Sequence, residues 1–319
     1  MKNASKSVIS SPDQTGALRT KLARKIASFV GPREKLLTDI PGLLLSRRTA
    51  PTAPASATYE PSLAVVAQGQ KRADLGGTTF IFDESRYLLT SLDLPVICNV
   101  IEASEAVPYL CFVLKLEIPV VRELLSREEI QAAEAPPDTP AMATGETTAE
   151  LLDACCRLID LLNTPQDIPF LSGLIQREII YRILRGPEGA RLRAIATLGD
   201  QSHRTAKAIA WIKTNYAKPL RLEELAQIAG MGLSTLHHHF RALTAMSPLQ
   251  YQKQFRLQAA RGRMLVDGLD AASEAFEVGY ESASQFNREY SRFFGQPPMR
   301  DIRTLRSPSG PQLESVSKR

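Results

Sequence analysis

The sequence has little of what anchors a protein in a membrane or staples it with disulfides. Its 319 residues include four cysteines and one tryptophan, and no run of eighteen apolar residues that could span a bilayer. The cysteines (Cys98, Cys111, Cys155 and Cys156) have neither metal-site nor disulfide-framework spacing. The first residues lack the apolar core of a secretory signal. We therefore predict a cytoplasmic protein with no membrane partner and no disulfide.

Histidine is equally scarce, and the positions of the histidines exclude a barrel metalloenzyme. All four histidines lie at or beyond His203, whereas a barrel metalloenzyme needs imidazole ligands on its strands. No Gly-x-Ser-x-Gly elbow, phosphate loop or zinc spacing is present. Neighbours His237, His238 and His239 point in three directions around a helix, so they cannot chelate one ion. We predict no metal, no cofactor and no catalytic residue, and keep a barrel enzyme as the alternative.

Both halves carry charges of both signs, but the balance between them differs along the chain. Residues 36–199 hold 14 Lys+Arg against 21 Asp+Glu, whereas residues 200–306 hold 15 against 10. A basic half suits contact with a polyanion. We expect a flexible segment at 1–35 containing a short docking helix at 18–30, domains at 36–199 and 200–306, and a flexible tail at 307–319.

The acidic half begins with short β-type runs. Residues 63–68, 78–83, 87–92, 96–101 and 109–116 are rich in β-branched and aromatic residues, and turn formers such as Gly76-Gly77 and Leu94-Pro95 separate them. This spacing predicts an antiparallel barrel or sandwich, which is either solid or holds one small ligand. Helices are expected at 120–130, 148–162 and 168–185, with a flexible loop at 132–146. The helical sides could also serve a homodimer.

The basic half contains one helical layout twice. Leu222, Leu225, Ala226 and Ala229 share a helix face, Gly230 can end that helix, and a second amphipathic helix follows. Residues 271–294 repeat this layout around Gly279, and a long helix at 248–266 joins the two copies. Each copy has the form of a helix-turn-helix, whose second helix enters the major groove of DNA.

These motifs resemble the AraC/XylS family of bacterial transcription regulators over residues 204–306. The resemblance is carried by Leu225-Ala226, Phe240, Ser247-Pro248-Leu249-Gln250-Tyr251, Val278-Gly279-Tyr280-Glu281-Ser282, Gln285-Phe286-Asn287-Arg288-Glu289-Tyr290 and Phe294-Gly295-Gln296-Pro297-Pro298. Residues 36–125 are similar to the cupin-like N-terminal domain of one branch, through Tyr59-Glu60-Pro61-Ser62-Leu63, Gln68-Gly69-Gln70-Lys71 and Asp93-Leu94-Pro95. One departure is Gly232, which stands where many members cap the first reading helix with Ser.

The resemblance implies an α+β protein: a cupin-like antiparallel β-barrel with helices, then an all-α domain with two helix-turn-helix motifs joined by a linker helix. It implies a DNA-binding transcription regulator whose barrel senses an unidentified small-molecule effector. The partners expected are double-stranded DNA, RNA polymerase and a second copy of the chain. A cupin-like enzyme and an effector-independent architectural DNA-binding protein remain the alternatives.

The outward faces of the two second helices supply the DNA-contacting candidates. Hydrogen-bonding side chains on those faces can read base edges, and nearby guanidinium groups can bind phosphates. Arg288 is a candidate for either role. The base-reading candidates are Ser234, His237, His238, Ser284, Gln285 and Arg288, and the phosphate candidates are Arg241, Arg256, Arg292 and Arg300.

Overall fold

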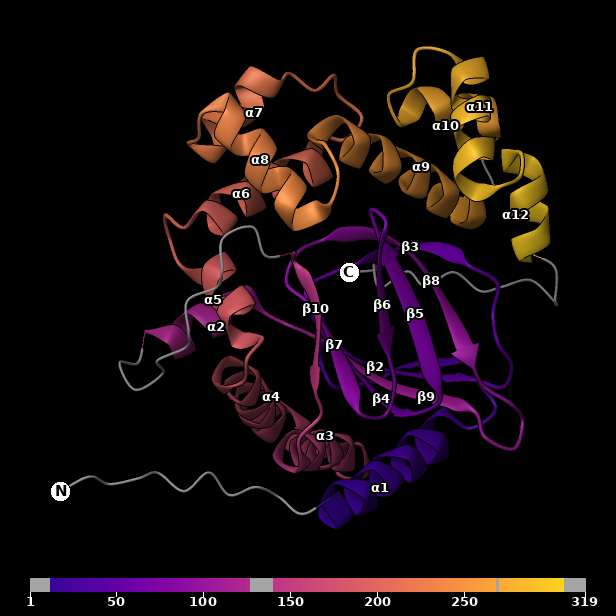
Figure 1. Cartoon of the computed structure of the whole chain (residues 1–319). Coiled ribbons are helices and arrows are strands. Elements are labelled where there is room, and N and C mark those ends of the chain that lie inside the picture. Colours follow the sequence, from indigo (N-terminus) through magenta and orange to yellow (C-terminus); the bar gives the residue numbers. More distant parts are fainter. Residues whose placement is uncertain (1–11, 127–139, 268–269, 307–319) are drawn as a thin grey trace.

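Two antiparallel sheets form the N-terminal half of the computed structural model, which describes residues 12–126, 140–267 and 270–306 (Figure 1). A six-stranded sheet has the order β1-β2-β9-β4-β7-β10, and a four-stranded sheet has the order β3-β8-β5-β6. The strands are β1 (Lys35–Leu37), β2 (Leu43–Arg48), β3 (Ala55–Tyr59), β4 (Ser62–Gln68), β5 (Gln70–Leu75), β6 (Thr78–Phe82), β7 (Arg86–Thr90), β8 (Leu94–Glu102), β9 (Tyr109–Lys115) and β10 (Met142–Glu146).

All five predicted strands are present, as β4, β6, β7, β8 and β9, and β1, β2, β3 and β5 lie between or before them. The four-stranded sheet needs β5 because it pairs with both β6 and β8. The expected flexible loop at 132–146 is wrong in its last part, since β10 (Met142–Glu146) pairs along β7. That pairing is long-range. The segment is short, contains Gly145 and lacks the alternation of apolar and polar residues that would predict a strand.

Helices cover the outer face of the six-stranded sheet. They are α1 (Pro12–Val30), α2 (Ile118–Leu125), α3 (Ala149–Asp160), α4 (Ile168–Arg185) and α5 (Gly189–Ala196). Helix α1 packs on β2, β4 and β9 and on α3 (Figure 1), and Leu22, Ile26 and Val30 are fully buried. The docking helix predicted at 18–30 is therefore confirmed, but it begins earlier, at Pro12, and burial of this apolar stripe fixes it, so the flexible segment expected over 1–35 does not include residues 12–30. Residues 1–11 and the expected tail at 307–319 lie outside the described residues.

The C-terminal half is helical. Its helices are α6 (Gln201–Asn215), α7 (Leu222–Ala229), α8 (Leu233–Thr244), α9 (Pro248–Asp267), α10 (Ala271–Glu277), α11 (Ala283–Phe294) and α12 (Pro298–Arg306). The helix-turn-helix pairs are α7–α8 and α10–α11, with α9 between them, so the predicted layout is confirmed. Asp200 caps α6 by accepting from the backbone N–H of Ser202 at 2.7 Å.

The apolar core is divided in a way that the charge balance does not suggest. One cluster combines the inner faces of the sheets with α6, α7, α8 and the start of α9. A second belongs to the six-stranded sheet and its helices, and a third belongs to α9–α12 alone. The first helix-turn-helix therefore shares its core with the barrel, and the second has a core of its own.

Candidate DNA interface and effector cavity

The first helix-turn-helix is shaped by its turn. Gly230 ends α7 in the left-handed conformation with φ 65°, where an L side chain is strained. Gly232 occupies the N-cap of α8, as expected, and has no side-chain acceptor for the first N–H groups. Leu225, Leu236 and Phe240 are fully buried and hold the two helices together.

The outer face of α8 carries the predicted reading residues of the first unit. Ser234, His238 and Arg241 are exposed and share one face at spacings of four and three residues, whereas His237 is half-buried at its edge. The His238 ring lies edge-on to His239 with centroids 5.3 Å apart. The first unit therefore presents one imidazole and one hydroxyl for bases, beside one guanidinium suited to a phosphate.

The second helix-turn-helix has stronger caps. Asp270 accepts from the N–H groups of Ala272 and Ser273 at the start of α10, and Ser282 Oγ accepts from Gln285 N at the start of α11. Ser284, Gln285 and Arg288 are exposed on the outer side of α11. Arg292 on the same helix and Arg300 on α12 are also accessible, so both guanidinium groups can be approached by a phosphate.

Arg256 is placed differently from the other arginines. Its guanidinium donates to the carbonyl oxygens of Tyr216 at 2.6 Å, Gly279 at 2.9 Å, Lys218 at 2.9 Å and Ala217 at 3.3 Å. Burial lowers the pKa of this half-buried group, which nevertheless stays protonated. The expected phosphate role is therefore not supported: the donors of Arg256 are already engaged in fastening α9 to the end of α6 and to the second turn.

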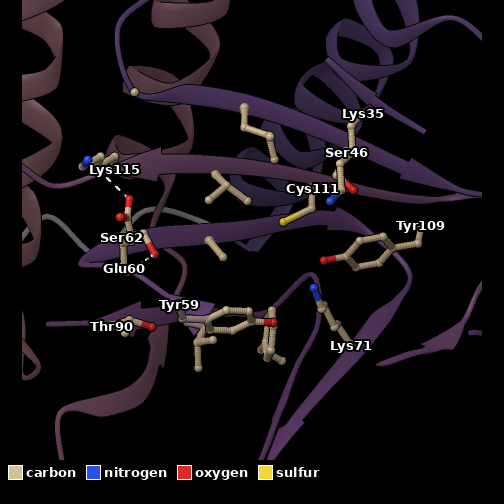
Figure 2. A pocket seen from close by; sticks show the side chains of 16 residues that line it. Lys35, Ser46, Tyr59, Glu60, Ser62, Lys71, Thr90, Tyr109, Cys111 and Lys115 are labelled. Carbon is tan, nitrogen blue, oxygen red and sulfur yellow. Dashed lines mark hydrogen bonds and ion pairs between the residues drawn. The ribbon is translucent and has the colours of Figure 1, made fainter. Parts of the chain in front are cut away.

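A cavity lies between the two sheets (Figure 2). Its lining is largely apolar in the middle, through Leu44, Ala64, Leu88 and Val113 among others, and the space open to the centre of a water-sized sphere is about 70 Å³. At one end the side chains of Lys35, Lys71 and Tyr109 converge beside Cys111 (Figure 2). Lys71 is only 7% exposed, so its charge faces the interior.

An ion pair lies at the other end of the cavity. Lys115 Nζ lies 3.3 Å from Glu60 Oε2, and Ser62 and Thr90 lie beside the pair (Figure 2). The sequence pattern permits a solid or a hollow barrel and indicates no cavity residue by itself. Two cavity residues could nevertheless have been found from the sequence, because Glu60 and Lys71 both lie inside the motifs that carry the cupin-like resemblance.

Comparisons with known proteins bear on both halves. Residues 39–191 match the model of the AraC-type transcriptional regulator N-terminus, and residues 225–303 match that of a helix-turn-helix domain. The activator RhaS of Yersinia pestis is 30% identical over 105 residues, which cover 33% of this chain and 38% of RhaS. ArgR of Pseudomonas aeruginosa is 26% identical over 132 residues, covering 41% of this chain and 40% of ArgR.

The chain belongs to the AraC family of regulators. Its fold agrees with that of ToxT from Vibrio cholerae, with a TM-score of 0.56 at 8% identity over 83% of this chain and 98% of ToxT. The aligned part spans about two fifths of the RhaS and ArgR chains. This AraC-family chain thus combines an effector-type N-terminal domain with a double helix-turn-helix. In the part of the chain that the structure describes, no helix has the length and apolarity needed to cross a bilayer.

Proposed function

We propose that the protein is a cytoplasmic transcription regulator that binds DNA sequence-specifically through α8 and α11 and senses a small molecule in its barrel. The observation that carries the proposal is the pair of exposed reading faces on two helix-turn-helix units, joined by α9 and attached to a domain that contains a cavity. Regulation rather than catalysis is what this arrangement suits, because each of its parts has a binding role.

The two reading helices have different chemistry. Gln285 can pair with adenine and Arg288 with guanine, whereas the His238 imidazole makes a weaker contact with guanine. We expect α8 and α11 to enter successive major grooves about 34 Å apart on one side of the duplex. Most discrimination between sequences should therefore come from α11. Ser234, His237, His238 and Ser284 add further base contacts, and Arg241, Arg292 and Arg300 bind the backbone.

The effector cavity suits a ligand with an apolar body and an acidic group. Its middle is apolar, and the amines of Lys35 and Lys71 lie together at one end, where a carboxylate or phosphate would be favoured. A structure of ToxT holds an unsaturated fatty acid, which is a ligand of this chemical type. We propose that the effector lies along the cavity with its acidic group toward Lys71.

The DNA proposal is tested by selecting binding sites from a random duplex pool with the full chain and measuring affinity by gel shift at fixed salt. Gln285→Ala and Arg288→Ala should each weaken specific binding by about 1–3 kcal/mol. Arg185→Ala, an exposed arginine on α4, is the matched control and should have no effect. Unchanged affinity in both α11 variants would refute the assignment, and an equal loss on unselected DNA would make Arg288 a phosphate contact.

Surfaces outside the DNA interface are available for protein partners. On α4, Phe170 is 77% exposed and Leu174 is 62% exposed one helical turn away, which is costly for a surface that nothing covers. We propose that this face contributes to a homodimer, and that RNA polymerase is a partner of the DNA-bound protein. A regulator without an effector predicts identical DNA affinity with and without every cavity ligand, which titrations on the selected site distinguish.

A further inference from the structure

One lysine makes a polar contact between the barrel and the DNA-binding half. Lys213 of α6 donates to Asp93 Oδ1 at 2.7 Å and to Glu60 Oε1 at 3.1 Å, and both carboxylates belong to the barrel. Tyr251 of α9 donates to the backbone oxygen of the same Asp93 at 2.7 Å. Because α6 packs against α7, α8 and α9, a force on Lys213 acts on the helix that supports the first reading unit.

Glu60 is also part of the cavity. Its side chain is 12% exposed, and its second oxygen, Oε2, lies 3.3 Å from Lys115 Nζ, which lines the cavity too. One carboxylate therefore joins two ammonium groups, that of Lys115 at the cavity wall (Figure 2) and that of Lys213 on the DNA-binding half. Among the salt bridges of the described residues, this chain of charges connects the cavity to α6 within two contacts.

The three linked charges of Lys115, Glu60 and Lys213 respond to a ligand in the cavity. Burial works to lower the pKa of Lys213, but Asp93 and Glu60 outweigh it and raise the pKa, so Lys213 stays charged and attracted to both. A ligand that lies along the cavity with its acidic group toward Lys71 brings its other end to Lys115, where a hydrogen-bond acceptor of the ligand competes with Glu60 for that amine. Interactions between charges a few ångströms apart in a partly buried site are strong enough to shift such a contact.

We infer that Glu60 is the positioning residue through which occupancy of the cavity reaches the DNA-binding half. In the empty cavity, Glu60 is shared between Lys115 and Lys213 and helps to fasten α6 to the barrel. A ligand whose far end takes Lys115 from Glu60 alters the Glu60–Lys213 contact, while Asp93 remains on Lys213 as the second carboxylate. This inference rests on the proposed effector site, but the contact it describes exists without a ligand.

The test uses the full chain without ligand and measures amide hydrogen exchange in α6. Glu60→Gln should raise the exchange rates in α6 about fivefold, and Lys213→Met should raise them more, because it also loses the contact with Asp93. The double variant should raise them no further than Lys213→Met, because Glu60 acts on α6 through Lys213. Lys213→Arg should retain the protection. Lys25→Met removes an ion pair with Asp160 between α1 and α3, and as the matched control it should leave α6 unchanged.

The contact between Glu60 and the cavity residue Lys115 is tested with Lys115→Met. This change should alter the exchange of α6 in the wild-type background and have no effect in the Glu60→Gln background. Additive effects of Glu60→Gln and Lys213→Met, or an α6 indifferent to Lys115, would overturn the inference. Thermal unfolding of each variant confirms that it folds.

The last step relates this contact to DNA. On a duplex selected by the wild-type chain, Glu60→Gln and Lys213→Met should shift the affinity in the same direction by about fivefold, which is within the usual range of coupling between sites. A changed exchange of α6 with unchanged DNA affinity would overturn the inference while leaving the proposed function intact. If no duplex is selected at all, the proposed function fails, whereas the exchange measurements remain valid.

Discussion

Replacing Arg256 separates two roles that its sequence position leaves open. As a phosphate ligand it would lie at the DNA surface, whereas in the structure it donates to four carbonyl oxygens. The variant to make is Arg256→Met, because Met preserves much of the apolar stem and removes only the guanidinium. The bonds to Tyr216 and Gly279 are part-buried, whereas those to Ala217 and Lys218 are exposed, so water can replace the latter pair.

The expected loss follows from the two part-buried bonds. Hydrogen bonds with a charged partner contribute about 1.5–3 kcal/mol each, and the lower value applies because the group is half-exposed. Arg256→Met should therefore lower the free energy of unfolding by roughly 3 kcal/mol, measured by urea denaturation of the full chain. The salt dependence of DNA binding should keep its slope, since no phosphate contact is lost.

A phosphate contact would give the opposite pattern. Its removal reduces the slope of log affinity against log salt by about 0.9 and leaves stability unchanged. The matched control is Arg292→Met, since Arg292 is accessible on α11, and it should show that pattern. An Arg256→Met protein of wild-type stability with a reduced salt slope would refute the structural role.

Two further predictions concern the turn glycines and the apolar face of α4. Gly230→Ala should cost about 1–2 kcal/mol, because only the left-handed backbone opposes it and its added Cβ would have no heavy atom within 4 Å. Gly279→Ala should cost several-fold more, since its Cβ would lie 2.0 Å from the oxygen of Ala217; equal melting temperatures in calorimetry would contradict this. Phe170→Ser should shift a dimer toward monomer in light scattering without lowering thermal stability, and an unchanged mass would remove α4 from the interface.

Local pattern is sufficient to predict the helical half and part of the barrel. Periodicity and turn residues predict both helix-turn-helix units and α9, because each depends on contacts within a few turns of the same segment. Phe276 shows where this reasoning stops. Periodicity puts it on the apolar face of the second unit, but it is 58% exposed, because α10 turns Glu274 inward, where it pairs with Arg263 at 2.9 Å.

Long-range pairing accounts for what the sequence does not predict. Strand β10 forms only because it pairs with β7 across some fifty residues, and the Glu60–Lys213 contact joins residues 153 positions apart. The sequence predicts a phosphate ligand at Arg256 because a basic residue on a linker helix fits either role. The Arg256 guanidinium instead donates to carbonyl oxygens, and these bonds depend on how α6, α9 and the second turn meet, which no local pattern specifies.

The division of the core gives the two DNA-binding units different stabilities. The first unit shares its buried residues with the barrel, and Phe240 lies in the same cluster as Leu88 and Val96. The second unit packs with α9 and α12 in a separate cluster, around Phe286 and Tyr290. A unit with a smaller, separate core should open without disturbing the rest of the chain.

Native-state hydrogen exchange should therefore show two groups of amides. Those of α6, α7 and α8 should exchange together with those of the inner strands, whereas those of α10 and α11 should exchange from a lower opening free energy and lose protection at lower denaturant concentrations. A ligand bound in the barrel should then change the exchange of the first group and leave that of the second unchanged. If the exchange of α11 instead changes as much as that of α8, the effector signal passes through α9 to both units, and the reading helix with the stronger base contacts is regulated as directly as the first.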